Sequence, residues 1–465
     1  GSQAYFLYTA GAAYYNSWKE RNMRIQLSDH FSCRRLLRFV LPSVVMMICT
    51  SVYSIVDGLF ISNFVGKTQF AAVNLIFPAL MAMGTLGFMI GTGGSAIIAK
   101  TLGEGRRDKA NQYFSMLIYA TILFSVLISI PGVLFIRPIS LAMGATSEMV
   151  DSCVLYGRIL IGAQTAFILQ NVFQSFFVVA EKPGLSLKLS IAAGLTNFIF
   201  DFLFIAVFQW GVAGAAAATV MGQMVGGVVP LIYFSRRNDS LLRLTKAKWE
   251  GRVLLRACTN GSSEMLTNLS ASLVNILYNF QLIKLAGEDG VAAYGAIMYV
   301  CFIFAAIFIG YSIGSAPIIS YHYGAGNHGE LKNLFRKSLT LIGVCGVSLT
   351  LLAELFSFPL TKAFVGYDAK LLTMTCRGFQ LYALSFLISG FNAFGSAFFT
   401  ALNNGVVSAA ISFLRTLAFQ TAVILILPAV LKLDGVWLSL PIAELLALSV
   451  TIAFFIWKRK QYHYA

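Results

Sequence analysis

The sequence predicts an all-α membrane protein of twelve transmembrane helices, arranged as two six-helix lobes that are related by a parallel internal repeat. Three observations lead to this fold class. Only 11% of the 465 residues are charged, whereas soluble domains average about 25%. Apolar runs long enough to cross about 30 Å of hydrocarbon recur along the whole chain. Finally, the second half of the chain repeats the pattern of the first half.

The apolar runs divide the chain into twelve candidate spans. A helix needs about 20 apolar residues to cross a bilayer, and each run meets that length. A β-barrel, the other fold that spans membranes, would show shorter segments of alternating hydropathy. The predicted spans are residues 36–64, 70–98, 113–136, 153–178, 185–208, 212–234, 257–283, 291–319, 337–360, 378–402, 405–430 and 435–457.

The repeat is clearest after the second and the eighth predicted spans. Residues 91–114 resemble residues 312–335, and Gly93 aligns with Gly314 at an offset of 221 positions. Both copies start on the same side of the membrane, because an even number of helices separates them. Transporters commonly build a midplane cavity between such halves, although duplication can also simply enlarge a scaffold. The same offset pairs Gly66 with Gly287, Gly105 with Gly326, Ala180 with Ala401 and Gly184 with Gly405.

These boundaries predict four regions. Residues 1–22 begin Gly-Ser and fit no signal peptide, so we expect a non-native or disordered extension before a native start at Met23. Residues 23–235 would form the first lobe and residues 257–465 the second. The basic segment 236–256 would link them in the cytoplasm.

The net charge of +15 follows from basic residues that gather in alternate loops. This distribution is the positive-inside pattern and predicts that both termini are cytoplasmic. Contact with anionic membrane lipid explains the basic surplus, so we expect no nucleic-acid partner. The seven cysteines are scattered without metal-binding spacing. No metalloprotease or intramembrane-protease motif is present, so the sequence favours a protein that is not an enzyme.

Polar residues inside the predicted spans are the candidate functional residues. Asp57 is the only acidic residue of the run 36–64, and a carboxylate at a helix centre costs about 2.5–3.5 kcal/mol on insertion scales. Asn197 and Asp201 are four residues apart, hence on one helix face, and Thr219 lies in the next span. Their oxygens suit Na⁺ or a shared proton, whereas Asn197 and Thr219 alone could simply satisfy backbone groups.

Three stretches carry a family resemblance that extends over roughly residues 30–458. They are GTGGSAIIAKTLGEGRRDKA, VVAEKPGLSLKLSIAAGLTNFIFDFLFI and GVAGAAAATVMGQ. They resemble the multidrug and toxic compound extrusion (MATE) transporters, with the MepA-like bacterial branch most similar. The resemblance assigns Asp57, Asn197, Asp201 and Thr219 to Na⁺ or H⁺ binding.

The resemblance also implies a function and a location. It implies an antiporter that exports amphipathic, often cationic organic compounds by alternating access, coupled to Na⁺ or H⁺ and without another cofactor. It places the chain, as a monomer, in the plasma membrane of a bacterium, crossing it many times. Lipid-linked or glycolipid flipping, which relatives in the same superfamily perform, stays an alternative.

The second lobe departs from the first at the candidate ion residues. At the offset of 221, Asp57 aligns with Tyr278 and Asp201 with Ala422, so the ion site should be confined to the first lobe. Arg415 pairs with Glu264 or another acid, or extends its charge to the membrane surface. The candidates for substrate contact or a second coupling site are Glu264, Arg415, Gln164, Asn171, Asn275, Tyr278 and Asn392.

Overall fold

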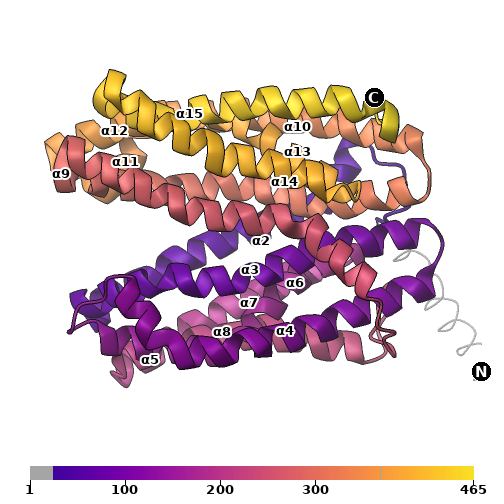
Figure 1. The fold of residues 1–465 in the computed structure, drawn as a ribbon, viewed down its shortest axis with the longest axis horizontal. Helices are drawn as coiled ribbons and strands as arrows, with labels where there is room; N and C mark the ends of the chain where they lie inside the picture. The colour runs from indigo at the N-terminus through magenta and orange to yellow at the C-terminus, as the bar shows by residue number, and fades with distance from the viewer. Residues whose placement is uncertain (1–24, 367) are drawn as a thin grey trace, which may run out of the picture.

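The computed structural model describes residues 25–366 and 368–465, and these residues form helices and no strands. The helices run roughly parallel in two bundles, one above the other in Figure 1. The lower, indigo-to-pink bundle is the first lobe and the upper, orange-to-yellow bundle the second. The expected extension 1–22 lies outside the described residues.

The first lobe contains the helices from α2 to α8. Two of its spans end in a π-helical turn, and one is broken at Ala163. The elements are α2 (Cys33–Phe60) with η1 (Ile61–Val65), α3 (Lys67–Gly103), α4 (Arg107–Ala142), α5 (Val150–Gly162), α6 (Gln164–Val179), α7 (Pro183–Asp201) with η2 (Phe202–Val207), and α8 (Gly211–Ser235).

The second lobe follows a non-helical linker, residues 236–250. The linker lies along α4, where the Thr245 N–H donates to Ser115 Oγ at 2.8 Å. The elements are α9 (Gly251–Gly324), α10 (His328–Leu355), α11 (Ser357–Val365), α12 (Ala369–Ala383), α13 (Phe386–Ala401), α14 (Gly405–Phe413), η3 (Leu414–Phe419) and α15 (Gln420–Tyr462).

The described helices supply the twelve predicted passes. Eight helical segments are long and apolar enough to span a membrane, and two bent pairs bring the number to ten. Two of these ten are each divided by a break, which makes twelve. The 74 residues of α9 would extend about 110 Å as one helix, and Gly287 breaks it into two spans. Lys432 breaks α15 in the same way. The twelve-helix prediction is therefore confirmed, and each predicted span overlaps a helix or a bent pair.

Backbone landmarks show the repeat and correct its offset. Gly66 and Gly287 both have positive φ, as do Gly105 and Gly326, so the first part of each lobe keeps the offset of 221. Where the fourth and tenth spans end, the offset is 222. The positive-φ residues Glu181 and Asn403 end the corresponding helices. The break between α12 and α13 holds two residues where that between α5 and α6 holds one. The sequence-based pairings Ala180 with Ala401 and Gly184 with Gly405 are therefore wrong by one residue.

The two lobes touch at the end of the molecule that holds the linker, called the linker end below. There α9 crosses α3 so closely that a Cβ added to Gly261 would overlap the Met89 carbonyl oxygen. Near the tips of both helices, Gly103 and Gly324 contact the opposite backbone in the same way. Small residues allow such approach between membrane helices. We call Gly93, Gly103, Gly261 and Gly324 the glycine contact.

A short segment before α2 joins the two lobes at the linker end. The Leu27 N–H donates to Glu181 of the first lobe at 2.6 Å. The Phe31 N–H donates to Glu330 of α10 at 2.9 Å. The Lys337 ammonium donates to the Phe31 carbonyl at 2.7 Å. Leu27 and Phe31 are fully buried, so the segment holds both lobes at once.

Replacing Glu330 with alanine is expected to release this segment. The carboxylate accepts hydrogen bonds from the Phe31 N–H and Asn333 Nδ2 and contacts His30, and bonds to a charged group contribute about 1.5–3 kcal/mol each. Hydrogen exchange at the Phe31 amide should quicken about tenfold or more. The exposed Arg336 on the same helix provides the control, Arg336→Ala. If the Phe31 amide exchanges equally fast in the two variants, Glu330 does not hold this segment in place.

Candidate functional site

Four polar residues of the first lobe lie together between α2, α7 and α8. Asp201 and Asn197 are each 1% exposed and Thr219 is 8% exposed. Asp57 is partly buried, and its Oδ1 atom is fully covered. The structure thus brings together all four residues that the sequence selected for ion binding. Asp57 lies in the half of its span that is farther from the linker end.

Hydrogen bonds connect these four residues directly. The Asp57 and Asp201 carboxyl groups share a hydrogen bond, and Asn197 also bonds Asp57. In the amide orientation that satisfies both neighbours, Asn197 Nδ2 donates to Asp201 Oδ2 at 2.9 Å. Its Oδ1 accepts the Thr219 N–H at 3.1 Å. The spacing of Asn197 and Asp201 along α7 makes this arrangement possible, since residues four apart face the same way.

Two tyrosines that sequence reasoning missed complete this cluster. Tyr53 lies within electrostatic range of both Asp57 and Asp201. Tyr156 of α5 is 2% exposed, and its hydroxyl bonds the Thr219 side chain. Tyr53 is four residues before Asp57 on α2, so helical spacing could have found it. No sequence signal points to Tyr156, because only tertiary packing brings α5 to this place.

The charges of the cluster fit a bound cation or proton. Two carboxyl groups within hydrogen-bond distance in a buried site need either a cation between them or a proton on one of them. Asp57 Oδ1 and Asp201 Oδ1 are buried without a hydrogen-bond partner among the described residues. Within the described part of the chain, the groups that bond the two carboxyl groups include no lysine or arginine. Hard oxygen atoms of this kind are ligands for Na⁺.

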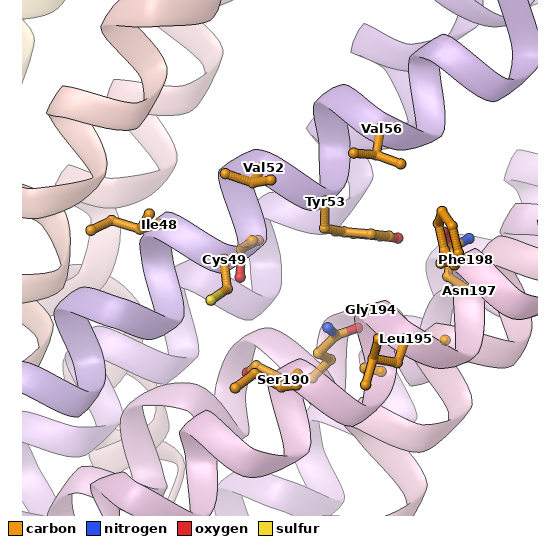
Figure 2. A pocket seen from close by; sticks show the side chains of 15 residues that line it. Ile48, Cys49, Val52, Tyr53, Val56, Ser190, Gly194, Leu195, Asn197 and Phe198 are labelled. Carbon is orange, nitrogen blue, oxygen red and sulfur yellow. The ribbon is translucent and has the colours of Figure 1, made fainter.

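A cavity of about 320 Å³ adjoins the cluster between α2, α6, α7 and α8. Figure 2 shows Tyr53 extending from α2 toward Asn197 and Phe198 on α7. Most of the wall is apolar, and Gln170 and Asn197 add amide groups. Its size and lining suit a small amphipathic molecule. Asn197 and Tyr53 belong to both the cavity wall and the cluster. An ion bound in the cluster and a molecule bound in the cavity would therefore affect each other's binding.

Two other predicted residues of the first lobe do not line this cavity. Gln164 is 2% exposed, and its Nε2 donates to the Leu80 carbonyl at 3.3 Å. Asn171 donates to the Phe167 carbonyl of its own helix at 3.1 Å. Both amides therefore bond backbone oxygen atoms, whereas the neighbouring Gln170 reaches the cavity.

The second lobe contains a buried ion pair where several candidates were predicted. Arg415 Nε donates to the two carboxylate oxygens of Glu444 at 2.8 and 3.0 Å. Asn392 Nδ2 donates to Glu444 Oε2 at 2.7 Å, and Thr451 donates to Asn392 Oδ1 at 2.8 Å. The acid that pairs with Arg415 is thus Glu444, which sequence reasoning did not select as a functional residue.

The remaining candidates of the second lobe are Glu264, Tyr278 and Asn275. Glu264 is half-buried and within electrostatic range of Arg415, whose ion pair is with Glu444. Tyr278 is 1% exposed and stacks on Tyr294, with ring centroids 5.2 Å apart. Asn275 is exposed. The repeat places Tyr278 where the first lobe has Asp57, so the second lobe holds an uncharged group at that position.

Comparison with known families supports the duplicated fold. The family model described as MatE matches residues 42–203 and 264–426, one segment in each lobe. Together these segments cover more than half of the chain. One model that matches twice agrees with the internal repeat.

Relatives of similar length are named for export, multidrug resistance or transport. Multidrug export protein MepA of Staphylococcus saprophyticus is 22% identical over 76% of this chain and 80% of its own. Probable multidrug resistance protein YoeA of Bacillus subtilis is 23% identical over 92% of this chain and 95% of its own. The FAD transporter of Shewanella oneidensis is 23% identical over 71% and 74%.

Solved structures share the fold. One is an outward-facing conformation of a multidrug resistance MATE family transporter of the MOP superfamily, with a TM-score of 0.87, 22% identity, and coverage of 94% of this chain and 98% of that chain. Another is MATE in complex with MaL6, with a TM-score of 0.87, 21% identity, and coverage of 93% and 97%. The chain therefore belongs to the MatE family, the multidrug and toxic compound extrusion (MATE) transporters, which are multi-pass membrane transporters and not enzymes.

Proposed function

We propose that this transporter is an antiporter that exports amphipathic, often cationic organic compounds in exchange for Na⁺ or H⁺. One observation carries the proposal: the cavity and the carboxyl cluster share Asn197 and Tyr53. A cation at Asp57 and Asp201 therefore changes the wall of the compartment that holds the substrate. Coupling requires such a shared element.

The cluster offers a mechanism for this exchange. Asp57 belongs to α2 and Asp201 to the end of α7, and the cavity lies between these two helices. A cation or proton between the carboxyl groups removes their repulsion and draws α2 toward α7, which narrows the cavity and favours substrate release. Without the ion, the repulsion favours a wider cavity. The ion shifts the equilibrium because its affinity differs between the two arrangements.

The cavity lining supports the proposed class of substrate. Aromatic faces at Tyr53 and Phe198 attract organic cations through cation–π contact. The aliphatic wall, which includes Ile48 and Val52, accepts apolar parts of the same molecule. The names of MepA and YoeA, multidrug export and multidrug resistance, agree with such breadth.

The two lobes would provide alternating access. The basic linker marks the linker end as cytoplasmic under the positive-inside rule. In this arrangement the glycine contact and the segment 25–31 close the cytoplasmic side. The cavity lies within one lobe, between α2, α6, α7 and α8, and we propose that the transporter works as a monomer. A flippase would need a cationic cavity, and the candidate cation, Arg415, is bound to Glu444.

Transport by the purified chain in proteoliposomes tests this function. A fluorescent organic cation is loaded, and an inward Na⁺ or proton gradient is imposed separately at constant membrane potential. We expect one of the two gradients to accelerate export by about 5- to 150-fold, the range of typical coupling energies. Dissipating that gradient with an ionophore is the control. Export at the same rate with and without either gradient would rule out antiport.

A further inference from the structure

The two lobes differ in how they balance buried negative charge. The first lobe has Asp57 and Asp201 together, and the described groups around them are tyrosines, an amide and a threonine. The second lobe has Glu444 with Arg415 bound to it, and Glu264 within electrostatic range of the same guanidinium. The first lobe therefore needs an external cation, whereas the second carries its own.

Arg415 lies on the helix that corresponds to a wall of the first-lobe cavity. Lys182 directly precedes α7 and Asn404 directly precedes α14, and these helices are repeat-related. Arg415 is eleven residues after Asn404, and the same count from Lys182 reaches Ala193. Ala193 lines the first-lobe cavity. The first lobe thus has the small side chain of Ala193 beside its cavity, and the second lobe has the guanidinium of Arg415 at the corresponding position.

The polar contacts of Glu444 are already satisfied. Its Oε1 accepts from Arg415, and its Oε2 accepts from both Arg415 and Asn392. Glu444 is 1% exposed and Asn392 is fully buried. Thr451 fixes the Asn392 amide by donating to its oxygen. In contrast, Asp57 and Asp201 each keep a buried oxygen that bonds no group in the described part of the chain.

We propose that Arg415 is a resident cation that balances the buried acid charge of the second lobe, as an exchangeable cation does in the first, and so limits coupling to the first-lobe site. This inference rests on the proposed antiport. Arg415 thereby sets the number of ions exchanged per substrate. Without it, Glu444 and Glu264 would form a second pair of acids that needs a mobile ion.

The test compares Arg415→Gln with Arg415→Lys, which keeps the positive charge. The ion-to-substrate ratio is measured in proteoliposomes as the ratio of opposing gradients at which net flux is zero. We expect Arg415→Gln to exchange one more ion per substrate than the unaltered protein, and Arg415→Lys to exchange the same number. The added ion should disappear in Arg415→Gln/Glu444→Gln. An unchanged ratio in Arg415→Gln would overturn the proposal.

A binding measurement on the purified chain separates this proposal from the antiport itself. Radioactive Na⁺ bound per chain and the infrared band of protonated carboxyl groups are recorded for the same variants. Arg415→Gln should gain one Na⁺ or one protonated carboxyl group relative to Arg415→Lys, whether or not transport is coupled. No gain would overturn the proposal. Failure of gradient-driven flux in the unaltered protein would instead overturn the proposed function.

The neutral double variant covers the case in which Arg415→Gln does not fold. Arg415→Gln/Glu444→Gln leaves no unpaired charge at the two substituted positions and keeps an amide at both. It should transport with the ratio of the unaltered protein, since neither side chain holds a mobile ion. If this folded variant loses gradient-driven export but still binds substrate, Glu444 takes part in coupling and Arg415 is not merely its resident cation.

Discussion

Replacing Asp201 with asparagine is expected to remove gradient-driven export while the cavity still binds substrate. Asparagine keeps the size of the side chain but removes one of the two charges that hold the cation. Asp57 is then left beside uncharged neighbours, and the ion loses a ligand oxygen that is buried without another partner among the described residues. In the unaltered protein we expect the gradient to accelerate export about 5- to 150-fold, the range of typical coupling energies. In Asp201→Asn, export should be about as fast with the gradient as without it.

The measurement is export of a fluorescent cation from proteoliposomes with and without the gradient, together with equilibrium binding of the same compound. Asp151→Asn is the matched control, since Asp151 is exposed and pairs with Arg137 at 3.1 Å. The control should keep full acceleration. If Asp201→Asn keeps it as well, the carboxyl cluster is not the coupling site. Retained substrate binding distinguishes loss of coupling from loss of the fold.

The sequence was sufficient for the transmembrane architecture because bilayer thickness imposes one length on every span. It did not predict the breaks at Ala163 and at Leu384–Ser385. Hydropathy continues through both breaks, and neither contains proline. The offset between the lobes changes at those breaks, which is why the later residue pairs were aligned one position wrongly. At the corrected offset Asp201 aligns with Val423, which is still not an acid.

The ion cluster could be found from sequence because an acid inside an apolar span is costly and is kept mainly where it binds an ion or a partner. Asp57 and Asp201 stood out singly, and the four-residue spacing linked Asn197 to Asp201. The pair of Arg415 and Glu444 could not be found in this way. The two residues are 29 positions apart on different spans, and each looks like an isolated charge until packing brings them within 2.8 Å.

A single methyl group at Gly261 is expected to open the linker end. In the present arrangement a Cβ at this position would overlap the Met89 carbonyl oxygen, and the Gly93 backbone is also in close contact. Backbone atoms cannot move aside as a flexible side chain can, so the lobes must separate. Forcing extra volume into a close contact costs about 1–3 kcal/mol. Gly261→Ala should therefore shift the population toward a form open at the linker end, by roughly 5- to 150-fold.

Distances between spin labels placed at the exposed residues Arg106 and Asn327 would measure this shift, since the two lie at the linker end on opposite lobes. Gly295→Ala is the matched control, because a Cβ there meets no atom of the described residues within 4 Å. We expect a longer distance to gain population in Gly261→Ala alone. If both variants give the distribution of the unaltered protein, the glycine contact does not hold the lobes closed. If a bound ion cancels the gain in population of the longer distance, the glycine contact is coupled to the carboxyl cluster. Two separate sites can affect each other only through a shared conformational equilibrium.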